Sequence, residues 1–263
     1  MIARVVPAVG TGRARLLVER NLMVYRRTWL VLVSGFFEPL FYLLAIGVGI
    51  GALVGQVTGP DGHPISYTAF VAPALLASSA MNGAVFDSTF NIFFKLKHAK
   101  IYDSILATPV GAGDVALGEM TWALLRGLLY SVAFLTVMLA MGLVHSVWAV
   151  LALPAAALIG FAFASVGLAA TSLIRSWQDF EFVQLALLPM FLFSTTFYPL
   201  STYPRPLQIA VECTPLFHGV GLLRALTTGT VGWSLIGHAA YLAVMGLVGI
   251  TIAARRFERL LLT

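Results

Sequence analysis

Apolar runs of roughly 20 residues recur along almost the whole chain and constrain its fold more than any other feature. A run of about 20 apolar residues is what an α-helix needs to cross roughly 30 Å of hydrocarbon. The alternating pattern typical of a membrane β-barrel does not occur. Because only 10% of the residues are charged, the chain lacks the polar surface that a soluble core requires. The sequence therefore predicts an all-α polytopic membrane protein.

Six membrane spans are predicted within one membrane domain that covers residues 1–263. Basic residues gather before the first span and after the second, fourth and last, which by the positive-inside rule predicts that both termini are cytosolic. Binding of nucleic acid is the alternative for a basic chain, but no basic patch interleaved with aromatic residues supports it. The predicted spans are residues 29–54, 67–94, 115–141, 147–174, 180–198 and 233–254.

Residues 1–28 are predicted to lie in the cytosol, with a basic amphipathic helix over about 13–28. Arg13, Arg20 and Arg27 recur every seven residues, with Arg26 beside them and apolar residues opposite. Such a helix lies at the level of the lipid headgroups. An ordinary cytosolic tail is the alternative. We expect no cleavable signal peptide, since the first apolar run is too long for one.

Four charged residues fall within or at the edge of predicted spans, where a charge is costly and marks a functional or structural hotspot. Glu38 is interpreted either as a gate or contact to a partner subunit, or as a protonated or arginine-paired carboxylate. Asp87 and Arg126 are expected to pair with each other or with Glu119.

Gly47, Gly51 and Gly55 recur at intervals of four in the first predicted span. A face of this kind lets two helix backbones approach closely. It indicates either dimerisation or tight packing within the chain.

A short amphipathic helix is predicted between the second and third spans, and Pro109 stops it because proline cannot supply the next backbone donor. Its apolar stripe is expected to dock into a groove on a cytosolic partner. Lying on the lipid surface is the alternative. The stripe and its neighbours are Ile101, Ile105, Thr108, Tyr102 and Leu106.

The stretch from residue 189 to 229 is too apolar and too aromatic for a plain loop between two spans. Pro199, Pro204 and Pro215 mark its turns, and a helical segment carrying His218 and Arg224 follows. The pattern predicts a span that ends, re-enters the membrane or rests on its edge, and turns back on the outer side.

Motifs for nucleotide hydrolysis and for catalysis are missing from the sequence. It contains no G-x-x-x-x-G-K-[ST] phosphate loop, no H-E-x-x-H and no G-x-S-x-G. The five histidines lack metal-ligand spacing, and Cys213 is the one cysteine. We therefore expect neither a cofactor nor a metal in this chain. A membrane-embedded enzyme that modifies lipid is the second hypothesis for its function.

Five segments together resemble the type-2 ABC exporter permeases, in particular the nodulation-type lipo-oligosaccharide exporters and the daunorubicin-type drug exporters. They are EPLFYL from Glu38, YDSILATP ending at Pro109, LGE ending at Glu119, YPLSTYP ending at Pro204, and PLFHGVGLLR ending at Arg224. The resemblance covers almost the whole chain in order. Phe217 and His218 stand where a Leu-Thr-His pattern is expected, a minor departure.

The resemblance implies a six-span half-transporter of a bacterial plasma membrane that forms a dimer, here predicted to be a homodimer. Two copies of a separate cytosolic ATPase would bind ATP and Mg²⁺ and drive the export of an amphipathic substrate by alternating access. His98 to Thr108 would be the coupling helix, residues 199–229 the external re-entrant helices, and the basic N-terminal helix the interface helix.

Overall fold

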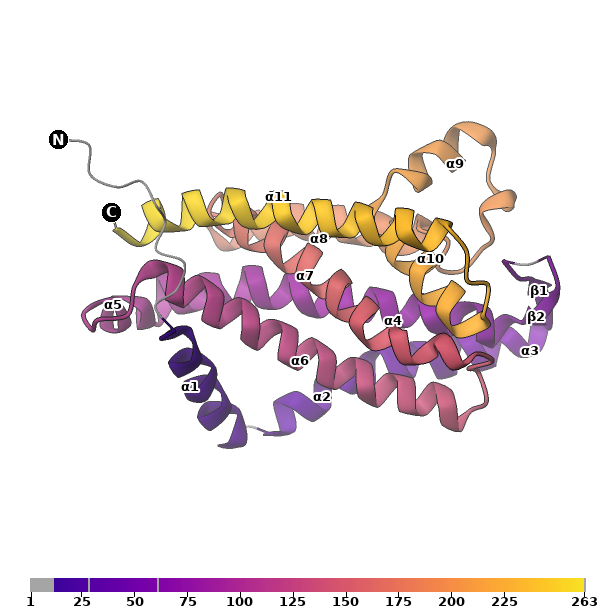
Figure 1. Cartoon of the computed structure of the whole chain (residues 1–263), viewed down its shortest axis with the longest axis horizontal. Coiled ribbons are helices and arrows are strands. Elements are labelled where there is room, and N and C mark those ends of the chain that lie inside the picture. The colour runs from indigo at the N-terminus through magenta and orange to yellow at the C-terminus, as the bar shows by residue number, and fades with distance from the viewer. Residues whose placement is uncertain (1–11, 28, 61, 263) are drawn as a thin grey trace.

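The computed structural model describes residues 12–27, 29–60 and 62–262. The described helices form an elongated bundle (Figure 1). One end carries α1 (Ala14–Arg27) and α5 (Ile101–Leu106), and the opposite end carries a β-hairpin and α9 (Arg205–Glu212). We call these the inner and the outer end, because the charge pattern predicts that the first faces the cytosol.

The first predicted span is a helical stretch from Trp29 to Val54. It comprises α2 (Trp29–Tyr42), the π-helical segment η1 (Leu43–Ile50) and α3 (Gly51–Val54). Gly55, with a φ of 73°, ends it. An antiparallel hairpin of β1 (Gln56–Thr58) and β2 (Pro64–Ser66) follows, with Val57 opposite Ile65.

The second predicted span forms the centre of the bundle, and the third packs against it. The second comprises α4 (Tyr67–Phe86) and the π-helical segments η2 (Asp87–Asn91) and η3 (Phe94–His98). The Ser66 hydroxyl accepts a hydrogen bond from the Ala69 N–H and caps α4, which satisfies one of the free donors at the helix start. After α5, α6 (Ala112–Ala140) returns to the outer end.

The second half of the chain begins with η4 (Val147–Leu151) and α7 (Ala152–Thr171). A tight turn with η5 (Trp177–Asp179) leads to α8 (Phe180–Phe193). In this turn the Arg175 and Ser176 N–H groups donate to the Asp179 carboxylate and lower its pKa. The remaining elements are η6 (Leu200–Thr202), α9, α10 (Pro215–Thr228) and α11 (Ser234–Leu262).

Within the described residues, five helical segments are long and apolar enough to cross a membrane, which confirms an all-α polytopic architecture. α9 and α10 would add a sixth only as a pair bent by 84°, the geometry of a broken span or a re-entrant pair. The five segments are Phe37–Val54, Tyr67–His98, Ala112–Ala140, Val147–Thr171 and Ser234–Arg256.

The predicted span over 180–198 is wrong in its extent, because α8 ends at Phe193. Its 14 residues reach only about 21 Å at 1.5 Å per residue. Ser194, Thr195 and Thr196 leave the helix and are buried, and Thr195 has a φ of 57°. Non-helical backbone is tolerated at membrane depth only where protein groups satisfy it. Arg224 does so, since its Nη2 donates to the Thr195 carbonyl over 2.7 Å.

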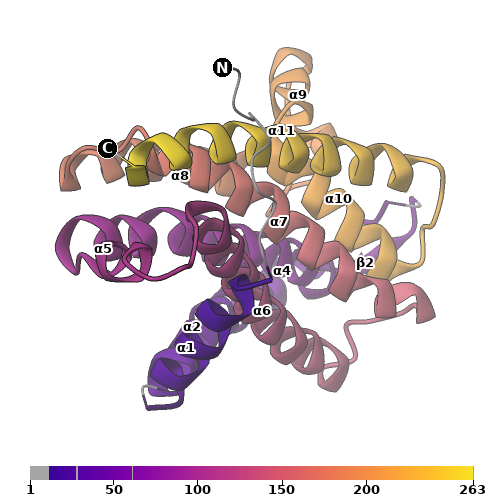
Figure 2. The ribbon, with the colours of Figure 1, turned by 60° about the vertical axis from the view of Figure 1, so that its left-hand side comes forward.

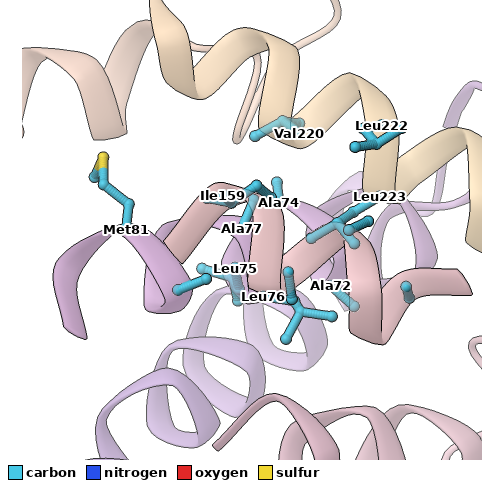
Figure 3. Packing of buried hydrophobic residues seen from close by; sticks show 14 of the residues in the cluster. Ala72, Ala74, Leu75, Leu76, Ala77, Met81, Ile159, Val220, Leu222 and Leu223 are labelled. Atoms are coloured by element: carbon cyan, nitrogen blue, oxygen red, sulfur yellow. The ribbon is translucent and has the colours of Figure 1, made fainter. Parts of the chain in front are cut away.

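The apolar core lies between α4, α7 and α10, where Leu76, Ile159 and Leu223 are fully buried (Figure 3). α6, α7 and α11 lie in succession, and α1 and α2 pack against α6 (Figure 2). α7 and α11 approach so closely that a Cβ at Gly249 would lie 2.9 Å from the Ser165 and Val166 backbones. Glycine therefore sets the spacing of these two helices.

Candidate coupling site at the inner end

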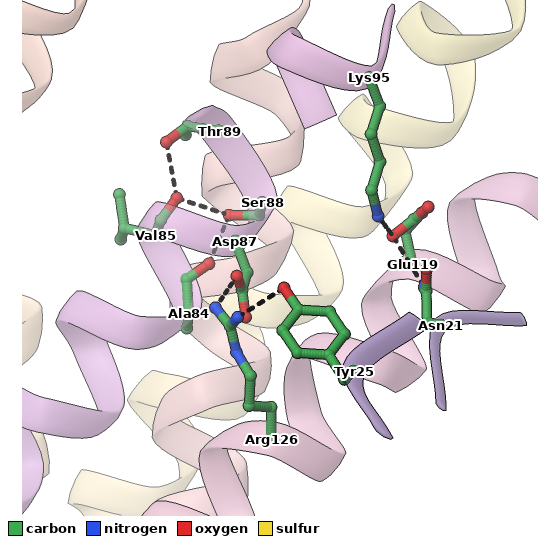
Figure 4. Close-up of polar contacts among 10 residues, drawn as sticks. All are labelled: Asn21, Tyr25, Ala84, Val85, Asp87, Ser88, Thr89, Lys95, Glu119 and Arg126. Atoms are coloured by element: carbon green, nitrogen blue, oxygen red, sulfur yellow. Dashed lines mark hydrogen bonds and ion pairs between the residues drawn. The ribbon is translucent and has the colours of Figure 1, made fainter. Parts of the chain in front are cut away.

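The candidate site consists of two polar contacts that α6 makes at the inner end. Glu119 and Arg126 are seven residues apart on α6 and so project from the same face. Each binds one side chain from the α4–η3 helix and one from α1 (Figure 4). We call them the Glu119 contact and the Arg126 contact.

In the Glu119 contact, one carboxylate oxygen serves two partners. Lys95 Nζ lies 2.7 Å from Glu119 Oε2, and Asn21 Nδ2 donates to the same oxygen over 3.3 Å (Figure 4). All three residues are buried. The contact therefore joins η3, α6 and α1 by a charge-assisted network shielded from water.

In the Arg126 contact, the guanidinium pairs with Asp87 and donates from Nη1 to the Tyr25 hydroxyl over 2.9 Å (Figure 4). The ring of Tyr25 lies 5.0 Å from that of Trp122, one turn earlier on α6. Asp87 and Arg126 are both buried. Of the predicted pairings, Asp87 has Arg126 as its partner, whereas Glu119 has Lys95.

α1 docks on α6 through close backbone contact as well as through polar groups. A Cβ at Gly118 would lie 2.7 Å from Leu17 Cβ and 2.9 Å from the Ala14 carbonyl, so only glycine fits. Arg13 donates to the Pro109 carbonyl, and Arg20 lies within 3.5 Å of the Asn21 side chain. Arg26 and Arg27 are exposed in the last turn, where the helix dipole favours cations.

Tyr102 of α5 points into the bundle and not outward. Its side chain is fully buried in an inner apolar cluster with Leu17, Met120 and Leu168. Burial, and then the charge of Glu119, raise the pKa of Tyr102 well above its usual value, so the phenol stays neutral. The hydroxyl lies beside Glu119 without a hydrogen bond of ordinary geometry. Tyr102 therefore links α5 to the span helices.

The predicted apolar stripe of the coupling helix also faces the bundle in part. Ile105 and Leu106 pack against the inner cluster, Ile101 is half-buried, and Thr108 and Pro109 are exposed. His98 stacks on Trp177 at 4.9 Å and is exposed. The side chains that α5 exposes are Asp103 and Ser104, and Ala107 directly after the helix is also exposed. An apolar stripe exposed to water would be costly, and packing inward removes that cost.

Replacing Tyr102 with Ala is expected to lower stability by about 3–5 kcal/mol, because it leaves a cavity in the inner cluster. Tyr102→Phe is the matched control and should be nearly neutral, since the hydroxyl it removes makes no hydrogen bond of ordinary geometry with the described residues. The thermal unfolding midpoint of the detergent-solubilised chain measures both. Equal midpoints for the two variants would contradict the buried position of this ring.

The glycines of the first span have different surroundings. A Cβ at Gly47 would lie 3.2 Å from the Thr68 side chain, and a Cβ at Gly51 would lie 3.0 Å from it. The Thr68 hydroxyl also donates a hydrogen bond to the Gly47 carbonyl over 2.6 Å. Both therefore pack within the chain against α4. Gly55 has open space around it and turns the backbone. Glu38 lies exposed on α2 and has no ion-pair partner among the side chains that the structure describes.

The three prolines of the predicted external segment lie at the starts of its helices. Pro199 and Pro204 precede η6 and α9, and Pro215 is the first residue of α10. His218 Nδ1 lies 2.8 Å from His238 Nδ1 of α11, and its ring stacks on Tyr241 at 3.9 Å. This histidine therefore joins α10 to α11.

Arg224 is buried and lacks an acidic partner among the described residues. Its Nε donates to the Phe70 carbonyl over 3.2 Å, and its guanidinium lies 3.8 Å from the centre of the Phe70 ring. Together with the bond to Thr195, these contacts join α10 to α4 and to the segment after α8.

Sequence reasoning missed Lys95, Asn21 and Tyr25. Lys95 belongs to the basic residues that follow the second predicted span, although it lies eight residues after Asp87 and so near the same helix face. Asn21 and Tyr25 are four residues apart on α1, which was a usable signal for a shared polar face. The described residues contain no group of three or more His, Cys, Asp or Glu side chains that could hold a metal.

Comparison with known proteins gives a consistent match over most of the chain. A family model described as "ABC-2 type transporter" matches residues 13–228. Nodulation protein J of Rhizobium leguminosarum bv. trifolii is 32% identical over 93% of this chain and 92% of the relative. Nodulation protein J of Sinorhizobium fredii is 32% identical over 93% of this chain and 92% of the relative. Nodulation protein J of Rhizobium meliloti is 30% identical over 81% of this chain and 80% of the relative.

Proposed function

Because this chain belongs to the ABC-2 type transporter family, we propose that it is the half of an ATP-driven exporter that forms the path, and that a separate ATPase supplies the energy. Members of this family are membrane-spanning transport subunits, and the apolar helices here agree with a multi-pass membrane protein. The proposed location is a bacterial plasma membrane, with both termini in the cytosol.

The observation that carries the proposal is the linkage of α5 to the spans. Tyr102 anchors α5 in the inner cluster beside Glu119, and Glu119 binds η3 and α1. A displacement of α5 by a cytosolic ATPase would therefore move the inner ends of α4 and α6 together. α4 continues to the outer end, where the Phe70 carbonyl holds Arg224 of α10.

In the proposed cycle, two copies of this chain form a path for an amphipathic substrate. Two ATPase subunits, each with ATP and Mg²⁺, close and pass their motion through the inner end. The path then opens between the copies, and the substrate leaves past α9 and α10. The closed ATPase must contact α5 more favourably in the outward-open state than in the inward-open state, because only such a difference can shift the balance between the two states.

A matched pair of substitutions tests this proposal. Ser104→Arg places a bulky cation on the exposed surface of α5, and Ser201→Arg makes the same change on the exposed surface at the outer end. In pull-downs of tagged chain in mild detergent, Ser104→Arg is expected to reduce the co-purified ATPase at least about tenfold, since the arginine side chain would hold the docked surfaces apart and a loss of about 1.4 kcal/mol is already tenfold. Ser201→Arg should leave it unchanged.

Three other results would count against the proposal. If no ATPase co-purifies with the unaltered chain, the transporter assignment of function fails. If Ser104→Arg retains the ATPase, α5 is not its docking site. If the isolated chain converts a lipid substrate without any ATPase, the lipid-modifying enzyme takes its place.

A further inference from the structure

An apolar groove with a volume of about 550 Å³ runs between α7 and α11. Its lining includes Val166 and Ala169 of α7 and Tyr241, Val244, Val248 and Ile252 of α11. The Tyr241 hydroxyl is already bound, because it donates to the Cys213 carbonyl over 2.9 Å. Both helices belong to segments that can cross a membrane, so either membrane lipid or another protein must fill the groove.

The groove is about as long as one membrane leaflet is deep. Tyr241 and Ile252 are 11 residues apart on α11, which corresponds to about 17 Å along the helix. One leaflet of a hydrocarbon core roughly 30 Å thick is about 15 Å deep. The C-terminal end of α11 lies at the inner end of the bundle (Figure 1). Trp233, which is 88% exposed, lies about 28 Å before Ile252, as suits an aromatic residue at the outer interface. The groove therefore follows the inner leaflet.

Two arginines stand at the inner end of the groove. Arg255 and Arg256 follow the lining residue Ile252 by three and four positions, so they lie on the groove side of α11. Side chains on a helix lean toward its N-terminus, which directs both arginines back toward the groove. The described parts of α7 and α11 contain no acidic residue, and the charges of Glu258 and Arg259 further along the sequence cancel.

The carboxylates near the inner end do not neutralise these arginines. In the turn between α7 and α8, Asp179 accepts backbone N–H groups of its own turn, and the exposed Arg175 adds a further cation there. Glu181 is exposed on α8. Arg255 and Arg256 are exposed, and neither pairs with any carboxylate among the side chains that the structure describes.

A second copy of this chain does not suit the groove. Two copies in one membrane are related by an axis along the membrane normal, so a given residue lies at the same depth in both. A contact through this face would bring Arg255 and Arg256 of each copy near those of the other, and like charges placed opposite each other are unfavourable. An occupant that combines an apolar chain with a negative charge satisfies both the groove and the arginines.

We propose that the groove holds one acyl chain of an anionic phospholipid of the inner leaflet, and that Arg255 and Arg256 bind its phosphate. Guanidinium groups bind phosphate oxygens through charge-assisted hydrogen bonds, often two at a time. The cytoplasmic leaflet is the one in which anionic lipids attract basic residues next to a membrane span. Such a lipid is a resident part of the protein and not its cargo, so its binding requires neither an ATPase nor ATP.

Titration of the detergent-solubilised full chain with two phospholipids tests the site. Phosphatidylglycerol is anionic, phosphatidylcholine is zwitterionic, and both probes carry the same acyl chains. Native mass spectrometry counts the lipids and the protein chains in each complex. The unaltered chain is expected to bind phosphatidylglycerol at least about tenfold more tightly than phosphatidylcholine, and Arg255→Gln/Arg256→Gln should abolish this preference without weakening phosphatidylcholine.

Each part of the site has a matched control. Arg26→Gln/Arg27→Gln removes the same charge from an exposed pair at the inner end, in the last turn of α1, and should keep the preference. Val248→Trp fills the groove from an exposed position and should weaken both lipids at least about tenfold. Leu247→Trp places the same ring on the exposed surface of α11 outside the groove lining and should change neither.

Three results would overturn the proposal. An equal loss of preference in the two arginine double variants would reduce it to the general charge of the inner end. Unchanged lipid binding by Val248→Trp would remove the acyl chain from the groove. A Val248→Trp complex that loses a protein chain in place of a lipid would make the groove an interface between copies.

Discussion

Asp87→Leu is expected to destabilise the protein by about 3–5 kcal/mol, because it leaves the Arg126 guanidinium buried without its counter-ion. The loss should be visible as a fall of several degrees or more in the thermal unfolding midpoint of the detergent-solubilised chain. Glu181→Gln, which neutralises an exposed carboxylate, is the matched control and should shift the midpoint little.

The double variant Asp87→Leu/Arg126→Met separates the pair's own contribution from the cost of an unpaired charge. Replacement of a whole buried ion pair by apolar groups is often neutral or stabilising, so the double variant should recover most of the midpoint. A double variant that is as unstable as Asp87→Leu alone would show that the contact depends on the bond to Tyr25 or on local packing.

Gly249→Leu is expected to prevent α7 and α11 from packing. Even a single Cβ at this position would lie 2.9 Å from the backbone of Ser165 and Val166. The backbone of a packed helix cannot change its conformation to relieve such a contact, whereas the end of a flexible side chain can. Gly249→Ala should already cost about 1–3 kcal/mol by overpacking. Yield of monodisperse protein after detergent extraction measures the first variant, and the unfolding midpoint measures the second.

Gly237→Ala is the control within the same helix. A Cβ there meets nothing within 4 Å, and alanine favours a helix over glycine by about 1 kcal/mol. This variant should therefore match or exceed the unaltered chain in stability. If Gly249→Ala behaved like Gly237→Ala, the close approach of α7 and α11 would be refuted.

Five of the six predicted spans overlap helical segments of the described chain that are long and apolar enough to cross a membrane, because hydropathy alone encodes them. The extent of α8 was not predictable in this way. Residues 194–198 remain apolar or weakly polar, and hydropathy does not reveal the long-range contacts of this segment, from Arg224 to Thr195 and between Ser194 and Thr214. The hairpin of β1 and β2 was missed because each strand has only three residues.

For the site at the inner end, the sequence predicted which residues of the spans carry charge but not all of their partners. Intramembrane charges are conspicuous in sequence, so Asp87, Glu119 and Arg126 were identified, and charge balance suggested that they pair. Partner choice depends on tertiary geometry. Lys95 reaches Glu119 only because α4 and its π-helical extension continue past the predicted end of the second span. The direction of Tyr102 likewise depends on the cluster it fills, which periodicity alone does not reveal.

The contacts of Arg224 also bear on the order in which the chain can be inserted into a membrane during synthesis. An arginine that enters the bilayer without partners is penalised by the insertion machinery by about 2.5–3.5 kcal/mol. Its acceptors, the carbonyls of Phe70 and Thr195, both precede it in the chain and have left the ribosome before it. N-to-C synthesis thus supplies the acceptors before the charge, whereas a circularly permuted chain that began at α9 would present Arg224 to the bilayer with nothing to receive it.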